Sequence, residues 1–383
     1  MGFETICVDA GSSETRIFSF GSNKVSVHNN AVWIDVPQDL NTEDFVSKTV
    51  GLNGSMLDSE NIVDIRIRKL DGVISGAIEK FVNRRILTGK LAETLSSKFK
   101  RLTSLKPKRE QPEYYINTLV SIMLDQIACN SDYYDVKLNI LIPPAEYISF
   151  KDIIIKLMAG EYEITHNLNK QKYRIRMDSK NISVYPECYS SFANICFNDN
   201  GKKTDLGQLL SNRRVMVIDI GKSTSDQSGI DSMKALGYTF YSFPFGCDYI
   251  INTLIASIAE KFGGYRPSYH VAEEAQRTGL LQDGNSLIEI YDIVNKARKT
   301  FADKYIQEFL NYLDIKDIHP KSIGYLLFTG GGALADERKL TISASSLVYE
   351  GFKEYSSNTQ GVFVEEPRLS NIKGLVKFIK ATS

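Results

Sequence analysis

The chain has 383 residues, and its 46 basic residues balance its 46 acidic residues. Because this length exceeds one average domain, we expect two lobes of roughly 150 to 200 residues each. The balanced charge creates no global field that would favour direct binding to nucleic acid or to a membrane surface.

Cysteine usage and the N-terminal sequence indicate a reducing compartment. The five cysteines have no C-x-x-C spacing, and their odd number argues against a disulfide framework. Residues 4–8 begin an apolar run, and neither the basic n-region nor the h-region of a signal peptide precedes it. No apolar run in the sequence has the length of a membrane span. We therefore expect a soluble, cytoplasmic protein.

Residues 5–20 predict a β-hairpin whose turn suits a phosphate group. An apolar strand reaches Asp9, and a second strand follows the turn. The turn residues are Gly11, Ser12 and Ser13. Glycine allows close approach of the backbone, hydroxyl groups donate to an oxyanion, and Arg16 on the returning strand would reach a phosphate as a charged donor. An ordinary hairpin explains this segment equally well on its own.

Short apolar runs separated by turn residues predict further strands over residues 24–75, and a basic segment follows. Residues 79–110 contain ten basic and three acidic residues. We favour a solvated, partly helical surface for this segment. The alternative is a contact for DNA, for an acidic adaptor or for a neighbouring subunit.

A helix is predicted over residues 113–130 and a strand over residues 136–142. Pro143 and Pro144 end this strand. We expect the turn after them to present Glu146 at the carboxyl edge of the sheet, where α/β folds bind their ligands. A lone glutamate is usually a surface residue, but this one lies between two candidate phosphate hairpins.

Residues 161–184 predict paired strands, the proline at position 186 predicts the start of a helix, and residues 198–212 predict a polar loop. The next strand, at residues 215–218, ends on Asp219, a residue type that can hold Mg²⁺ or its water ligands against phosphates. The phosphate turn that we expect after it consists of Gly221, Lys222, Ser223 and Thr224.

The Gly-Lys-Ser sequence in this turn also matches the end of a Walker A motif. That motif requires glycine where this chain has Met216, within the strand. A Walker loop also opens a helix, whereas residues 227–230 predict a returning strand. We therefore favour a second phosphate hairpin over a P-loop, and the repetition suggests a chain of two related halves.

Two helices are predicted after the central hairpin, at residues 249–262 and 286–312. Lys296 and Lys299 on the second helix are candidate nucleotide contacts, although surface lysines explain them as well. A strand then enters a run of three glycines, Gly330, Gly331 and Gly332. Residues without side chains let a backbone lie flat against a base, a ribose or an α-phosphate.

Together these motifs resemble those of the actin/Hsp70/sugar-kinase superfamily, in the same order and over the whole chain. The motifs are Asp9-Ala10-Gly11-Ser12-Ser13 with Arg16, Pro143-Pro144-Ala145-Glu146, Asp219-Ile220-Gly221-Lys222-Ser223-Thr224-Ser225-Asp226 and Gly330-Gly331-Gly332. The resemblance implies a two-lobed α/β actin-like ATPase fold, with duplicated ribonuclease-H-like domains and the nucleotide in the interlobe cleft. We expect lobe I to comprise residues 1–187 and 365–383, and lobe II residues 188–364.

Within the superfamily, the Pro-x-x-Glu-Tyr stretch and the length are most similar to the ParM group of plasmid-segregating bacterial actins. The resemblance implies ATP, with GTP as the alternative, and Mg²⁺ organised through water by Asp9 and Asp219. Glu146 would orient or deprotonate the attacking water, and the serines and threonine of the two turns would hold phosphates. Lys222 departs from the usual glycine, and Arg16 departs from the lysine of many members.

The same resemblance implies a protein that polymerises head to tail with bound nucleotide and depolymerises after hydrolysis. Its partners would be other copies of itself and a DNA-bound adaptor on a plasmid. The alternatives are a sugar-type kinase, for which we find no sugar-binding cluster, and a bacterial actin for cell shape or organelle positioning. An Hsp70-like chaperone is disfavoured because only about fifty residues follow the glycine triplet.

Overall fold

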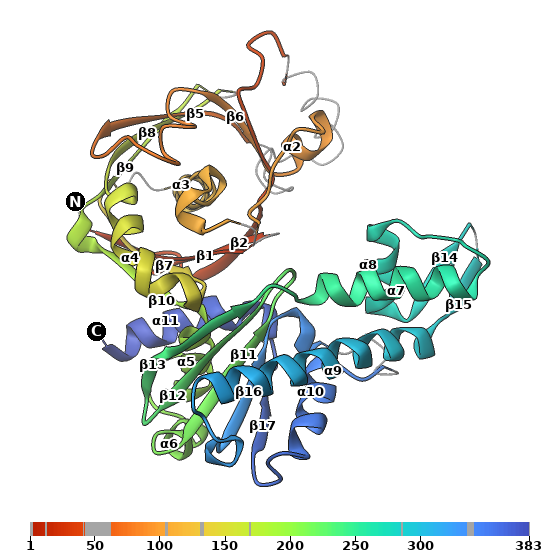
Figure 1. The fold of residues 1–383 in the computed structure, drawn as a ribbon. Coiled ribbons are helices and arrows are strands. Elements are labelled where there is room, and N and C mark those ends of the chain that lie inside the picture. The colour runs from red at the N-terminus through yellow and green to blue at the C-terminus, as the bar shows by residue number, and fades with distance from the viewer. Residues whose placement is uncertain are drawn as a thin grey trace. The chain divides into compact units, whose positions relative to one another are not determined.

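The structure, a computed structural model, describes residues 3–11, 14–40, 42, 63–103, 106–130, 134–167, 170–284, 286–334 and 341–382. Ser12 and Ser13 lie outside these residues. The chain divides into two compact units (Figure 1). Unit 1 consists of Met1–Ile142 and Glu146–Pro186, and unit 2 consists of Pro143–Ala145 and Glu187–Ser383.

The first sheet of unit 1 has the strand order β10-β7-β1-β2-β3. Its strands are β1 (Glu4–Ala10), β2 (Glu14–Ser19), β3 (Lys24–Asn29), β7 (Val136–Ile142) and β10 (Ile182–Pro186). The first three strands form an antiparallel meander, whereas β7 runs parallel to both β1 and β10. The predicted hairpin at residues 5–20 and the predicted strand at residues 136–142 are confirmed.

The second sheet of unit 1 is antiparallel, with the order β4-β6-β5-β8-β9. Its strands are β4 (Val32–Ile34), β5 (Val63–Asp71), β6 (Arg85–Thr88), β8 (Gly160–His166) and β9 (Lys172–Met177). The helices of this unit are α2 (Gly89–Leu95), α3 (Pro112–Ala128) and α4 (Pro144–Met158).

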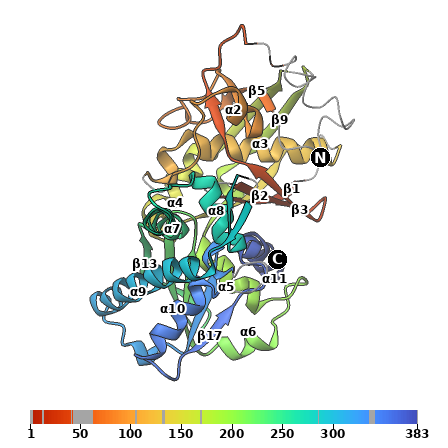
Figure 2. The same cartoon turned by 90° about the vertical axis from the view of Figure 1, so that its right-hand side faces the viewer.

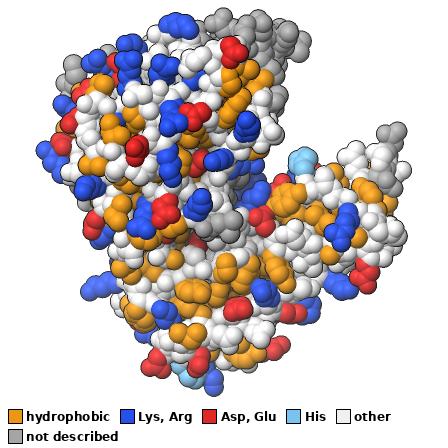
Figure 3. Space-filling model, turned by 45° about the horizontal axis from the view of Figure 1, so that its top comes forward, with side chains coloured by type: hydrophobic (Ala, Val, Ile, Leu, Met, Phe, Trp, Pro, Cys, Tyr) orange, Lys and Arg blue, Asp and Glu red, His pale blue; other side chains and the backbone are white. Residues whose placement is uncertain are grey.

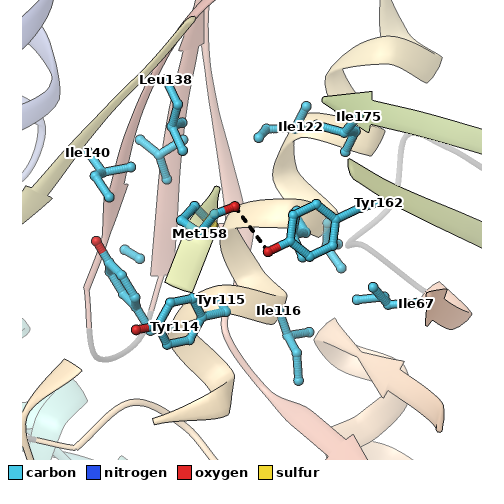
Figure 4. Packing of buried hydrophobic residues seen from close by; sticks show 14 of the residues in the cluster. Ile67, Tyr114, Tyr115, Ile116, Ile122, Leu138, Ile140, Met158, Tyr162 and Ile175 are labelled. Carbon is cyan, nitrogen blue, oxygen red and sulfur yellow. Dashed lines mark hydrogen bonds between the residues drawn. The ribbon is translucent and has the colours of Figure 1, made fainter. Parts of the chain in front are cut away.

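Helix α3 lies between the two sheets of unit 1 (Figure 1). It is buried almost all round because both sheets cover it. Figure 4 shows Tyr114, Tyr115 and Ile116 of α3 among apolar side chains of both sheets. Tyr162 of β8 joins this core, and its hydroxyl donates to the carbonyl of Met158 at 3.0 Å, which satisfies a polar group that burial would otherwise leave unpaired.

The sheet of unit 2 has the order β13-β12-β11-β16-β17. Its strands are β11 (Arg214–Ile220), β12 (Ser225–Asp231), β13 (Lys234–Phe243), β16 (Tyr325–Thr329) and β17 (Gln360–Phe363). As in unit 1, an antiparallel meander of three strands continues into two parallel strands. Strand β11 therefore corresponds to β1, and β16 corresponds to β7, which supports the two related halves expected from the repeated motif.

Both faces of the unit 2 sheet are covered by helices (Figure 2). The helices are α5 (Glu187–Cys196), α6 (Asp205–Leu210), α7 (Cys247–Lys261), α8 (Tyr269–Thr278), α9 (Tyr291–Ile315), α10 (Ala344–Lys353) and α11 (Ser370–Thr382). Strand β11 alternates between the two cores, with Val215 and Val217 packed against α5 and α6 and with Met216 and Ile218 on the side of α7, α9 and α10. A short hairpin of β14 (Leu280–Asp283) and β15 (Ser286–Glu289) follows α8.

Three elements differ from the sequence predictions. Glu146 lies in the first turn of α4 rather than in a loop, because Pro144 suits the first position of a helix as well as it ends a strand. The predicted polar loop at residues 198–212 contains α6, which Thr204 caps by accepting the N–H of Gly207. The long helix begins at Tyr291, since residues 286–289 form β15.

The C-terminal helix belongs to unit 2. Helix α11 packs against α5, and Gly374 lies against the carbonyl oxygen of Ser190. The division expected from the sequence places residues 365–383 with the first lobe, and the compact units differ from it at this end of the chain. No helix within the described ranges is long and apolar enough to cross a membrane.

Gly374→Ala should lower the free energy of unfolding by about 3 kcal/mol. An added Cβ would stand 1.7 Å from the Ser190 carbonyl oxygen, so α5 and α11 would have to separate. The matched control is Gly324→Ala, whose Cβ would meet its nearest atom at an ordinary 3.4 Å, and we expect a change within about 0.5 kcal/mol. Urea denaturation measures both effects, and equal midpoints for the two variants would contradict this packing.

Candidate functional site

The two predicted phosphate hairpins share a cross-strand register and a closing hydrogen bond. In unit 1, Asp9 pairs with Arg16 across the strands, and the N–H of Gly11 donates to the carbonyl of Glu14 at 2.9 Å. In unit 2, Asp219 pairs with Asp226, and the N–H of Gly221 donates to the carbonyl of Thr224 at 2.9 Å. Each hairpin thus places a buried aspartate two residues before the glycine that closes the turn.

The turn between β11 and β12 offers a set of backbone donors. The N–H groups of Lys222, Ser223 and Thr224 have no protein acceptor among the described residues. Consecutive N–H groups in a tight turn form a concavity that binds anions, and an oxyanion is the ligand that such a turn accepts best. The corresponding residues of the unit 1 turn, Ser12 and Ser13, lie outside the described residues.

Asp219 is 7% exposed at the carboxyl end of β11. Its Oδ2 accepts a hydrogen bond of 3.0 Å from the Nδ2 of Asn371, which comes from the N-terminal turn of α11. Asp226, 5% exposed, stands directly opposite it on β12. The sequence predicted Asp219 from its place at the end of a strand. Asn371 lies in a C-terminal segment that resembles a connecting segment of the superfamily, and nothing in the sequence signalled that its side chain would reach Asp219.

The glycine triplet follows β16, which is the parallel neighbour of β11. The carboxyl ends of parallel strands meet at one edge of a sheet, so Gly330 lies beside Asp219. Gly330 has φ +80°, and an added Cβ would stand 2.2 Å from Asp219 Oδ1. A Cβ at Gly332 would stand 2.4 Å from the side chain of Ile220, while one at Gly331 would meet Cys247 at 3.6 Å. Close packing therefore requires the first glycine beside the Asp219 carboxylate and the third beside the Ile220 side chain.

The side chains of the β11–β12 turn are directed towards neighbouring helices of unit 2. Ser223 Oγ donates to Asp248 Oδ2, in the first turn of α7, at 2.8 Å. Lys222 Nζ lies 3.6 Å from Glu273 Oε1 on α8. Lys222 was predicted as part of the phosphate turn, and in the structure the charge of its side chain is paired with Glu273.

In unit 1 the corresponding aspartate has a cationic partner. Arg16 Nη1 lies 3.1 Å from Asp9 Oδ2, and Arg16 Nη2 lies 3.2 Å from Glu14 Oε2. Asp9 is buried, so the guanidinium offsets a carboxylate that burial would otherwise destabilise. The carbonyl of Gly11 accepts a hydrogen bond from the side chain of Asn30, which anchors the turn.

Glu146 is half-buried in the first turn of α4. Its Oε2 accepts the backbone N–H of Lys108 at 2.8 Å, which fixes one carboxylate oxygen. A negative charge in the first turn of a helix is also favoured by the helix dipole. A glutamate held in this way is suited to orient a water molecule, because its own rotamer is already restrained.

The two predicted lysines of α9 lie on its exposed face. Lys299 Nζ pairs with Asp303, one turn further along the helix, at 3.1 Å, and Lys296 is exposed. The buried cation of this helix is Arg298, which donates to Thr341 Oγ1 at 2.6 Å and to the carbonyl of Gln276 at 2.9 Å. Both lysines are therefore exposed, and their role as nucleotide contacts stays a prediction.

Several basic side chains of the segment at residues 79–110 are buried in unit 1 or pair with acidic residues there. Arg85 Nη2 lies 2.6 Å from the buried Asp64. Burial raises the pKa of Asp64, but hydrogen bonds from Arg85, Asn167 and Thr42 outweigh burial and hold that pKa below its usual value. Lys108 is also buried. On the face shown in Figure 3, basic and acidic side chains are interspersed with apolar ones.

The residues around Asp219 suit a nucleotide-bound Mg²⁺. Within the described ranges no three His, Cys, Asp or Glu side chains are grouped to hold a metal by themselves. Mg²⁺ bound to a nucleotide needs only one or two carboxylates, because phosphate oxygens and water supply the other ligands. The glycine at position 330 keeps the space beside Asp219 Oδ1 free of a side chain, and Asp219 is the carboxylate of this unit that would face such an ion through water.

No family model matches the chain, and no curated protein sequence matches it. Solved structures do match it along its whole length. The archaeal actin homolog Ta0583 has 14% sequence identity and a TM-score of 0.69, with 100% of each chain covered. Its coverage includes both units of the present chain.

Two ParM structures match over nearly the same length. ParM in a 15-stranded filament from Clostridium botulinum has 14% identity and a TM-score of 0.64, with 99% of each chain covered. Bacillus thuringiensis ParM with AMPPNP has 12% identity and a TM-score of 0.63, covering 100% of this chain and 98% of that one. The chain therefore has the two-lobed α/β fold of the actin-like superfamily, with ParM and archaeal actin homologs as its structural relatives.

Proposed function

We propose that this protein is an actin-like ATPase that binds the phosphates of a nucleotide on the turn between β11 and β12. The observation that carries the proposal is the set of three consecutive N–H groups at Lys222, Ser223 and Thr224, which have no protein acceptor among the described residues. They lie three to five residues beyond a buried aspartate, in a hairpin whose cross-strand register recurs in unit 1. Backbone donors and a carboxylate for Mg²⁺ are the groups that a triphosphate requires.

ATP is the nucleotide that we favour, with GTP as the alternative. The ParM structure from Bacillus thuringiensis contains AMPPNP, an adenine nucleotide analogue. The glycine triplet after β16 supports the assignment, because a backbone without side chains lets a nucleotide lie close to the sheet edge. Gly331 and Gly332 begin a short 3-10 helix there.

Hydrolysis requires a group that orients the attacking water and groups that organise the charge of the phosphates. We assign the first role to Glu146, whose carboxylate is held by the N–H of Lys108. Asp9 and Asp219 would act on Mg²⁺ through water, and the ion when bound would neutralise charge on the β- and γ-phosphates. The polypeptide then contributes chiefly by positioning and by fixed donors rather than by covalent chemistry.

We further propose that the protein assembles head to tail into filaments. The structural likeness to ParM in a 15-stranded filament supports this assignment. A head-to-tail contact that does not close into a ring gives an open filament, and hydrolysis of the bound nucleotide would then set its lifetime. From the resemblance to ParM we also propose a cellular role for these filaments, which is to segregate plasmid DNA through a DNA-bound adaptor.

Gly330→Ala should weaken the binding of MgATP by about 10- to 100-fold, the range seen when groups that orient a metal-linked ligand are disturbed. The new Cβ would displace Asp219 Oδ1 and strain a backbone with φ +80°. Titration with a fluorescent ATP analogue measures the effect, and Gly324→Ala is the control. Absence of ATP and GTP binding by the parent protein with Mg²⁺ would overturn the proposed function.

Glu146→Gln should slow ATP hydrolysis by roughly 10² to 10⁴-fold while nucleotide affinity stays close to that of the parent. The amide keeps the size of the side chain and its acceptor for the N–H of Lys108, but it cannot take a proton from water. Phosphate release under single-turnover conditions measures the rate, with the exposed Glu110→Gln as the control. Hydrolysis at the parent rate would remove Glu146 from the mechanism.

MgATP should produce filaments that disassemble as the nucleotide is consumed. Light scattering follows this process and negative-stain electron microscopy shows the particles, while Glu146→Gln should prolong the polymer because hydrolysis ends its lifetime. Gly330→Ala, for which we expect weaker MgATP binding, serves as the control and should need a higher MgATP concentration to polymerise. A persistent monomer that phosphorylates a small molecule would favour the sugar-type kinase instead.

A further inference from the structure

The phosphate turn of unit 2 rests on the N-terminus of α7. The N–H of Cys247 donates to the carbonyl of Gly221 at 3.0 Å, and the N–H of Asp248 donates to the carbonyl of Lys222 at 2.8 Å. The first N–H groups of a helix have no partner within the helix, so here the turn satisfies them. The carbonyls of the turn are directed at α7. The backbone N–H groups of the turn point elsewhere and remain available to a ligand.

Gly246 makes this close approach possible. A Cβ at this position would stand 2.5 Å from the carbonyl oxygen of Gly221 and 2.7 Å from that of Thr224. The need for glycine arises from contact rather than from strain, since φ is −148°. The junction between the turn and α7 is therefore tightly packed, and Asp248 is held beside the turn.

The carboxylate of Asp248 connects the turn to α8. Its Oδ2 accepts the hydroxyl of Ser223 at 2.8 Å, and its Oδ1 accepts the hydroxyl of Tyr269, the first residue of α8. Each carboxylate oxygen thus accepts one hydrogen bond, and the two donors belong to different elements. Hydrogen bonds to an ionised acceptor are stronger than neutral ones, so this arrangement restrains both hydroxyl groups.

A hydroxyl group can donate only one hydrogen bond, and Ser223 donates it to Asp248. The Oγ of Ser223 then presents only lone pairs on its other side. Those lone pairs suit a water molecule or a cation that accompanies the nucleotide, whereas the backbone N–H groups are left to meet the phosphate. The orientation of Asp248 therefore decides what Ser223 can offer to a ligand.

Helix α8 makes a second contact with the same turn. Tyr269 and Glu273 lie one turn apart on the helix and so share a face. Lys222 Nζ lies 5.0 Å from the centre of the Tyr269 ring and 3.6 Å from Glu273 Oε1. Burial and the hydrogen bond to Asp248 raise the pKa of Tyr269, so its phenol remains a proton donor throughout the physiological range.

We propose that Asp248 is a positioning residue for the phosphate turn and that Tyr269, acting through Asp248, couples α8 to nucleotide binding. The inference rests on the proposed function, because it assigns a regulatory contact to the same nucleotide site. By linkage, a nucleotide that favours the orientation of Ser223 seen here also favours the docked position of α8, and displacement of α8 weakens the nucleotide.

The test is Tyr269→Phe, which removes one hydroxyl and keeps the ring that faces Lys222. We expect MgATP affinity to fall about fivefold or more, within the usual range of coupling between sites. The matched control is Tyr265→Phe, four residues earlier and 41% exposed, which should bind MgATP like the parent. Asp248→Asn is a second variant, and its loss should be at least as large because an amide has one acceptor for two hydroxyl donors.

A double-mutant cycle with Ser223→Ala separates coupling from general damage to the fold. If Tyr269 acts through Asp248 and Ser223, the effect of Tyr269→Phe on MgATP affinity should largely disappear in the Ser223→Ala background. Thermal unfolding of each variant without nucleotide identifies any loss of the fold. Additive effects, or an unchanged affinity in Tyr269→Phe, would overturn the inference and leave the proposed function standing. A parent protein that binds no nucleotide would overturn both.

Discussion

One backbone hydrogen bond determines the shape of both hairpins, from the N–H of a glycine to the carbonyl three residues further on. It measures 2.9 Å at Gly11 and at Gly221. A Cβ would approach the accepting carbonyl to 3.3 Å in the first hairpin and 3.1 Å in the second, so glycine fits with least crowding. In unit 2 this bond occupies the inward carbonyl, and the amides of Lys222 and Ser223 between its two ends have no protein acceptor among the described residues. The bond that closes this hairpin therefore also leaves the donors on which the proposed anion site depends.

The duplicated sheet explains why the candidate residues gather at strand ends. Strand β7 is parallel to β1, and β16 is parallel to β11, so each hairpin has a neighbouring strand that ends at the same edge. The two halves use that edge differently. In unit 1 the neighbour continues into α4 through Pro144 and leads to Glu146, while in unit 2 it ends at Gly330 against Asp219. One topology thus provides a restrained carboxylate in one half and, in the other, a buried carboxylate that packs against the glycine triplet.

Much of this arrangement could be predicted from local sequence, because strands, hairpin turns and amphipathic helices each have a short-range signal. Asp219 and Gly330 were found since they follow apolar runs of strand length. The partners of these residues could not be found in the same way. Asn371 and Asp248 reach the site only through the packing of α11 and α7, and helix α6 depends on a cap at Thr204 within a polar stretch. The pairing of Lys222 with Glu273 likewise depends on where α8 lies.

Lys222 shows how a departure from a motif can be accommodated. The superfamily that the motifs resemble usually has glycine at this position. A residue with a side chain would be strained there if the backbone were left-handed. Lys222 is not among the described residues with positive φ, so its backbone needs no glycine. Its N–H has no protein acceptor among the described residues, and its side chain extends over Tyr269 towards Glu273. The substitution therefore preserves the donors of the turn and adds a contact with α8, so the unusual residue strengthens the link between the turn and that helix.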